Sequence, residues 1–206
     1  LILGTNSIKD TGYDVANSAR FDGSNDTLNR TPSSAGNRKT WTWSGWIKFS
    51  DISSANRYIT SGYVGSSNTG YFAWYFHTDS KLTIQGWTTN FLVTTQVFRD
   101  PTAWQHLVIA LDTTQGTASN RLRVYLNGSE ITFFSTDNRS SISQNSDLGY
   151  NGAGSHVIGG YQSTGSINAG WNGYLTEIAF IDGQQLAPDQ FGEFDEDSGI
   201  WKPIDV

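Results

Sequence analysis

The segment Glu193–Asp197, which reads EFDED, carries four carboxylates and is the first candidate for chemistry in this chain. A pair of carboxylates hydrolyses a glycosidic bond with retention when the two groups lie about 5 Å apart across a sugar cleft. The segment lacks the apolar partners of a buried central strand, and runs of like charge usually form solvated surface. We therefore expect an exposed acidic turn, no catalytic residue and no enzyme activity.

Three other carboxylates stand at the ends of predicted strands, where oxygen ligands could hold calcium. Asp22 and Asp26 flank the turn residue Gly23, and Asp112 ends a buried run. The alternative is that these side chains hydrogen-bond to their own turns, which is the usual role of aspartate at such positions. We expect no required cofactor, with structural calcium at these residues as the alternative.

The histidines His77, His106 and His156 are far apart in the sequence, and the chain has no cysteine. No H-x-H or HExxH spacing supports a zinc site. No G-x-S-x-G turn supports a serine nucleophile. Core or rim positions are the expectation for all three histidines.

Aromatic residues beside polar turns are candidates for sugar stacking, because a ring face packs against the apolar face of a pyranose. Trp87, Tyr150 and Tyr161 lie next to Thr, Asn and Gly residues and are the predicted ligand-binding residues. The alternative is that these rings cover the ends of the fold or face a neighbouring subunit. Core positions are expected instead for four residues of the strand motifs: Trp41, Trp43, Trp104 and Trp171.

The elements that must position these residues centre on Trp104–Phe134. Its first part, to Asp112, has apolar residues on both alternating faces, which predicts a strand buried from both sides. Leu122, Val124 and Leu126 then alternate with outward residues. Asn127-Gly128 predicts a type I′ turn, and Glu130–Phe134 the return strand.

The rest of the chain repeats this pattern of short strands and polar turns, so we predict an all-β fold. Asp137–Ser155 is a predicted long polar loop, and Pro188–Phe194 offers a single helical turn. Further strands are expected at Ser18–Asp22, Asp26–Arg30, Trp41–Phe49, Tyr58–Val64, Tyr71–His77, Lys81–Gly86, Phe91–Phe98, His156–Tyr161 and Tyr174–Asp182.

Charge and composition exclude several classes of partner. The net charge of −6 over 206 residues is concentrated near the C-terminus, and the 13 Lys and Arg form no cluster, so nucleic acid is not an expected partner. The chain has no apolar run of 18 residues, so it has no predicted transmembrane helix. A membrane is therefore not an expected partner either. We divide the chain into an irregular lead-in at 1–17, one domain at 18–187 and an acidic tail at 188–206.

Five motifs resemble a laminin G-like domain of the concanavalin A-like jelly-roll superfamily: FDGSNDTL, WTWSGWIKF, WQHLVIALD, RLRVYLNG and WNGYLTEIAFIDGQQL. The resemblance implies a two-sheet antiparallel sandwich, with calcium near a sheet rim in many relatives. Laminarinase-type relatives carry a Glu-x-Asp-x-Glu strand whose two Glu side chains are nucleophile and acid/base. Here Asp197 stands where the second Glu should be, which argues against hydrolysis.

Three segments are similar to N-terminal modules of virion proteins from marine tailed bacteriophages: LILGTNS, SARFDGSNDTLNRTPSSAGNRKTWTWSGW and FGEFDEDSGIWKP. This resemblance implies a chain that continues past Val206. It also implies a non-catalytic module located on a phage particle, where it binds host-surface glycan or other virion proteins, in assemblies that include homo-oligomers. The alternatives are a capsid or tail decoration protein without a ligand, and a jelly-roll glycan hydrolase.

Overall fold

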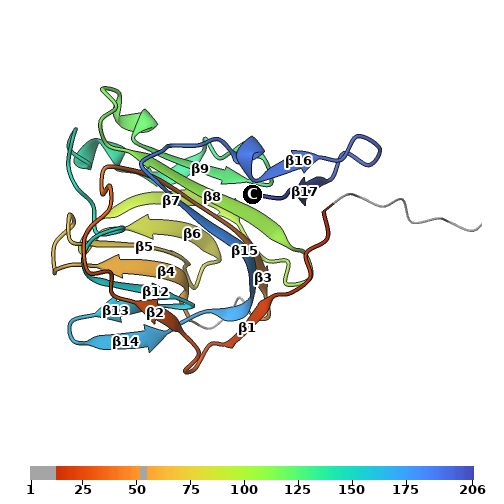
Figure 1. The fold of residues 1–206 in the computed structure, drawn as a ribbon, viewed down its shortest axis with the longest axis horizontal. Coiled ribbons are helices and arrows are strands. Elements are labelled where there is room, and N and C mark those ends of the chain that lie inside the picture. The colour runs from red at the N-terminus through yellow and green to blue at the C-terminus, as the bar shows by residue number, and fades with distance from the viewer. Residues whose placement is uncertain (1–12, 52–54) are drawn as a thin grey trace, which may run out of the picture.

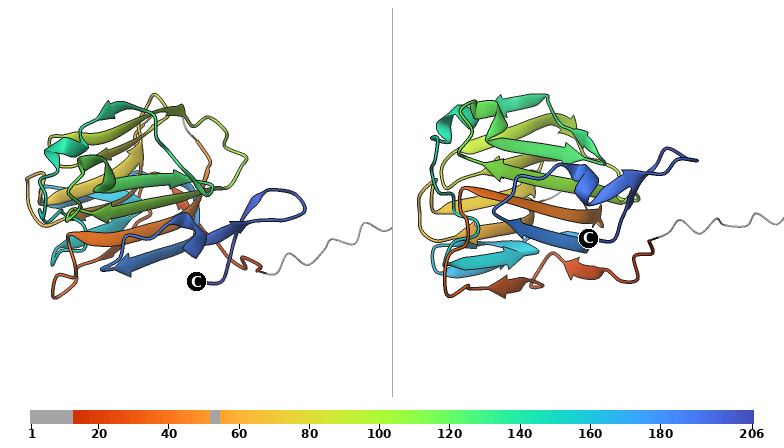
Figure 2. Two further views of the ribbon diagram at one scale, coloured as in Figure 1. Left: turned by 90° about the horizontal axis from the view of Figure 1, so that it is seen from above. Right: turned by 45° about the horizontal axis from the view of Figure 1, so that its top comes forward.

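The computed structural model describes residues 13–51 and 55–206, which form two large antiparallel sheets packed face to face (Figures 1 and 2). The six-stranded sheet contains, in spatial order, β1 (Ala19–Asp22), β15 (Asn172–Asp182), β3 (Thr40–Phe49), β8 (Gln105–Asp112), β9 (Leu122–Leu126) and β10 (Ser129–Glu130). The seven-stranded sheet contains β11 (Phe134–Asp137), β7 (Asn90–Val97), β6 (Lys81–Gln85), β5 (Tyr71–Phe76), β4 (Arg57–Tyr63), β12 (Ser155–Ile158) and β2 (Leu28–Arg30). The predicted all-β sandwich is confirmed.

Two small hairpins complete the described strands: β13 (Gly160–Ser163) with β14 (Ser166–Ala169), and β16 (Gly192–Phe194) with β17 (Trp201–Pro203). The helical content of the described residues is limited to three short 3₁₀ turns: η1 (Ala118–Asn120), η2 (Arg139–Ser141) and η3 (Pro188–Gln190). The predicted helical turn is therefore present but shorter than expected, because the chain enters β16 at Gly192. No helix among the described residues is long and apolar enough to cross a membrane.

Alternation along the strands fills the space between the sheets with large side chains. Trp41 and Trp43 of β3 pack against Trp74 of β5, with ring centroids 6.1 and 5.3 Å from it. Leu107, Ile109 and Leu111 of β8 are buried in the same core. Core positions predicted for Trp41, Trp43 and Trp171 are confirmed, since all three side chains are fully buried.

The turn after β9 is the predicted one, but the strand that follows is not. Asn127 and Gly128 have φ of 47° and 80°, the two positive values that a type I′ turn requires. The return strand β10 stops after Glu130, and the chain crosses to the other sheet, where Phe134 begins β11 beside β7. The expected continuous strand at Glu130–Phe134 is therefore wrong.

The C-terminal segment covers the outer face of the six-stranded sheet (Figure 2). Val108 and Ala110 of β8 and Tyr125 of β9 are buried there against Phe191. The predicted burial of β8 from both sides is thus confirmed, and residues 188–206 pack back on the sandwich.

Candidate ligand-binding surfaces

The outer face of the seven-stranded sheet carries a cluster of tyrosines. In β5, Phe72, Trp74 and Phe76 point into the core, so the alternate residues Tyr71 and Tyr75 face outward. Tyr58 of β4 joins them. Partly buried Tyr63, Trp87 and Tyr161 pack around these three, and we call the six residues the tyrosine surface.

The rings of the tyrosine surface pack closely against one another. The Tyr58 ring lies 4.4 Å from Tyr75, its partner across the strands, and 4.2 Å from Tyr161 of β13. The Trp87 ring stands edge-on to Tyr71 at 5.7 Å and lies 5.9 Å from Tyr63. Trp87 and Tyr161 are therefore parts of one continuous aromatic surface.

The hydroxyl groups of the tyrosine surface lie near one side-chain amide, that of Gln85. Tyr75 donates a hydrogen bond of 3.0 Å to Gln85 Oε1. The same amide lies against the hydroxyls of Tyr58 and Tyr71, where it offsets part of the effect of burial on their pKa. Burial nevertheless raises the pKa of all three tyrosines, so their hydroxyls stay protonated and able to donate.

Of the three predicted ligand-binding residues, the structure brings Trp87 and Tyr161 together and places Tyr150 elsewhere. Tyr150 is 6% exposed and belongs to the core between the sheets, with its ring 4.9 Å from Trp74. Its hydroxyl bonds to Thr60 Oγ1 at 3.0 Å, and burial raises its pKa to about 12. The expectation of an exposed Tyr150 is wrong, because its loop turns inward.

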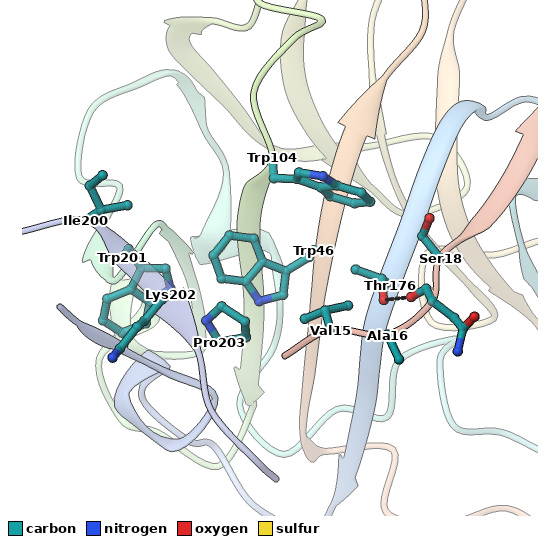
Figure 3. A pocket seen from close by; sticks show the side chains of 11 residues that line it. Val15, Ala16, Ser18, Trp46, Trp104, Thr176, Ile200, Trp201, Lys202 and Pro203 are labelled. Atoms are coloured by element: carbon teal, nitrogen blue, oxygen red, sulfur yellow. Dashed lines mark hydrogen bonds between the residues drawn. The ribbon is translucent and has the colours of Figure 1, made fainter. Parts of the chain in front are cut away.

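A second aromatic surface lies on the opposite sheet, where three tryptophans line a groove of about 440 Å³ (Figure 3). Trp46 of β3 forms the floor beside Trp201 of β17, and Trp104 stands at the edge of the groove. Trp104 is 36% exposed, so its predicted core position is wrong. It precedes β8, outside the strand whose alternation buries its neighbours. We call this site the tryptophan groove.

The calcium candidates Asp22 and Asp26 meet at one turn, where both carboxylates accept hydrogen bonds from the chain itself. Asp22 Oδ1 accepts from the backbone N of Ser24 and Asn25 at 2.8 and 3.2 Å, and Asp26 Oδ2 accepts from the N of Asp22 at 3.0 Å. Hydrogen bonds from Ser24 lower the pKa of Asp22 to about 2. This arrangement is that of an aspartate turn.

The third candidate, Asp112, lies apart from these two at the end of β8. Its Oδ1 accepts from Thr114 N at 3.0 Å and its Oδ2 from Gln115 Nε2 at 2.6 Å. In the described parts of the chain, no three His, Asp or Glu side chains gather closely enough to hold a metal ion.

The acidic segment Glu193–Asp197 lies on the hairpin outside both large sheets. Lys202 Nζ contacts Glu193 Oε1 at 3.3 Å and Asp195 Oδ2 at 3.4 Å, and Asp195 Oδ1 accepts from Ser198 N at 2.8 Å. The side chains of Glu193 and Glu196 are exposed. The expectation of an exposed acidic turn is confirmed.

Comparison with solved structures identifies relatives of the same fold. The heptameric SAP-like pentraxin of Limulus polyphemus has a TM-score of 0.56 and 21% identity, over 83% of this chain and 77% of that one. Domain 4 of AbnA, an extracellular arabinanase of Geobacillus stearothermophilus in complex with arabinotriose, has a TM-score of 0.55 and 16% identity, over 84% and 73%. The CBM40 of the Ruminococcus gnavus IT-sialidase, bound to alpha2,3 sialyllactose, has a TM-score of 0.57 and 13% identity, over 84% and 92%.

A search of curated proteins found no match. The family model described as the concanavalin A-like lectin/glucanases superfamily matches residues 22–189, which is most of the chain. Both large sheets fall within this range apart from the first residues of β1. The chain therefore belongs to the concanavalin A-like lectin/glucanases superfamily, as a laminin G-like domain.

Proposed function

We propose that this domain is a non-catalytic module of a bacteriophage particle that binds host-surface glycan through the tyrosine surface. The observation that carries the proposal is the convergence of partly exposed Trp87 and Tyr161 on three tyrosines whose hydroxyls gather at Gln85. Ring faces stack on the apolar face of a sugar, while hydroxyl and amide groups recognise its hydroxyls.

The charges near this surface favour a neutral sugar as the ligand. His77, whose ring lies 6.4 Å from Tyr75, contacts Asp79 at 3.1 Å, and Lys81 contacts the same carboxylate at 3.5 Å. Asp79 thus offsets the charge of Lys81, which would otherwise attract a carboxylated sugar. Among the fold relatives, an arabinanase domain and a CBM40 were solved with oligosaccharides, which supports glycan as the class of ligand.

A matched pair of tryptophan variants tests the placement of the site. We expect Trp87→Ala to weaken binding of a glycan selected on an array by about 5- to 30-fold, since stacking contributes on the order of 1–2 kcal/mol. Trp104→Ala removes a partly exposed tryptophan on the opposite sheet and should leave the affinity unchanged. Loss of binding in Trp104→Ala alone would move the site to the tryptophan groove.

The two alternatives are separated from this proposal by their own assays. A decoration protein without a ligand would bind no glycan on the array. A hydrolase would release reducing ends from laminarin, agar, alginate or bacterial surface polysaccharide, and the release would disappear in Glu193→Gln. We expect no release, because Glu193 pairs with Lys202 on an exposed hairpin.

The proposed location on a phage particle rests on the resemblance of three segments of the chain to virion modules. Location on the particle, contacts with other virion proteins and assembly with further copies all follow from that resemblance. Density for this domain in an intact particle is the expected result of imaging the virion. A particle that lacks the domain would remove the virion part of the proposal and leave glycan binding untouched.

A further inference from the structure

His106 lies beneath the C-terminal hairpin, near the start of β8 on the outer face of the six-stranded sheet. It is 1% exposed and has an aromatic neighbour on each side. The ring of Trp46 lies 5.0 Å from it with the planes inclined by 27°, and the ring of Trp201 lies 5.9 Å from it at 22°. Trp201 belongs to β17, so this contact joins the hairpin to the sheet.

The hydrogen bonds of the His106 imidazole show which of its two nitrogens carries the proton. Trp201 Nε1 lies 3.0 Å from His106 Nδ1, and an indole nitrogen can only donate. His106 Nδ1 must therefore be unprotonated, and the ring proton resides on Nε2. From there it is donated to Ser44 Oγ at 2.8 Å. The docked hairpin thus requires the neutral ring.

We propose that His106 is an acid-sensitive latch, which holds the β16–β17 hairpin on the sheet while its ring is neutral and releases it on protonation. A proton added at Nδ1 would face the indole N–H of Trp201. The hydrogen bond between the two rings would then be lost, because both nitrogens would be donors. The protonated ring would also be a buried cation, which is strongly unfavourable without a partner. Moving the hairpin away relieves both effects, because it separates the two donors and admits water.

Among the described residues, the groups packed around His106 include no compensating anion. Ser44 and Trp46 of β3 are neutral, and the backbone N of His106 donates to the neutral Asn127 side chain at 2.8 Å. On the hairpin, the carboxylates of Glu193 and Asp195 contact Lys202. Burial lowers the pKa of His106 to about 4, which sets the range in which the latch opens.

Release would change two surfaces at once. Trp201 and Pro203 of β17 line the tryptophan groove beside Trp46, so the groove exists only while the hairpin is docked (Figure 3). Phe191, immediately before the hairpin, covers buried Val108 and Ala110. An open latch therefore exposes an apolar sheet face, which an environment-sensitive dye would detect.

Acid titration followed by NMR tests the latch in the wild-type chain. The indole N–H signal of Trp201, assigned with Trp201→Phe, should move to a solvent-exposed position as the His106 ring titrates. The amides of Asp195 and Gly199, bonded within the hairpin, should lose protection while those of β3 and β8 keep it. Titration of the His106 ring while the hairpin stays docked would overturn the proposal. Loss of amide protection in the hairpin and in both sheets at the same pH would also overturn it.

Variants separate His106 from the other groups that titrate in acid. His106→Asn keeps an oxygen near the position of Nδ1 and cannot be protonated, so its hairpin should stay docked to lower pH than in the wild type. His156→Asn changes a half-buried histidine, whose Nε2 accepts from Asn151 N at 2.8 Å, and should leave the hairpin transition unchanged. Release at the same pH in His106→Asn would contradict the latch.

Discussion

Gly128→Ala tests whether the C-terminal hairpin lies on the β9–β10 turn in solution. Gly128 has a φ of 80°, and an added Cβ would lie 2.4 Å from Trp201 Cε3. The left-handed backbone costs an alanine about 1–2 kcal/mol, and displacing the indole costs about 1–3 kcal/mol. We expect a total loss of about 3 kcal/mol in the free energy of unfolding, or roughly 6–12 °C in melting midpoint.

Gly183→Ala is the matched control for this prediction. Gly183 has a φ of 81°, but an added Cβ would meet no atom within 4 Å. Its cost in thermal or denaturant unfolding is therefore the backbone contribution alone, about 1–2 kcal/mol. Equal losses in Gly128→Ala and Gly183→Ala would refute the docking of Trp201 over the turn, and the excess should disappear when Gly128→Ala is made in a Trp201→Ala background.

Three further predictions concern groups buried or held by hydrogen bonds. Tyr150→Phe leaves Thr60 Oγ1 without its partner, so denaturant unfolding should show a loss of about 1 kcal/mol with no change in glycan affinity; an altered affinity would contradict the core assignment. The pKa of His106 is lowered from 6.5 to about 4 in the folded state, so its contribution to stability is complete above pH 6.5 and lost as the pH falls toward 4. The wild type should lose about 3 kcal/mol over this window, while His106→Asn should show a flatter profile. Chelation of calcium should leave the melting midpoint unchanged, because turn donors already occupy the carboxylates of Asp22 and Asp112; a fall that added calcium reverses would reveal a bound ion.

Local patterns in the sequence predicted most strands of the two large sheets because burial imposes alternation on them. The single strand expected at His156–Tyr161 is wrong, since the chain divides there into β12 and β13, which belong to different sheets. The double-faced apolar run of β8, the strand expected at Trp41–Phe49 and the Asn127-Gly128 turn all have the predicted structure. The fate of the chain after Glu130 could not be predicted, because a return strand and a crossover to the other sheet use the same apolar residues. Register and sheet membership are set by contacts distant in sequence.

The candidate site was predicted only in part, since exposure depends on packing that no short window contains. Trp87 and Tyr161 stand beside polar turns and do lie at a partly exposed surface. Tyr150 has the same local context, yet its loop folds inward onto Trp74. The sequence YFAWYF of β5 does contain a pattern that indicates the tyrosine surface. Its two tyrosines lie on one alternating face, and its Phe and Trp residues lie on the other.

The most direct test of the central claim is the response of the indole N–H signals to a neutral oligosaccharide selected on the glycan array. Each of the eight tryptophans contributes one such signal, so a single spectrum reports on the tyrosine surface, the core and the tryptophan groove together. Binding at the tyrosine surface predicts that the Trp87 signal moves with saturating dependence on sugar concentration while that of Trp104 stays fixed. Movement of Trp104 and Trp201 with Trp87 unchanged, or no movement for any neutral sugar, would contradict it.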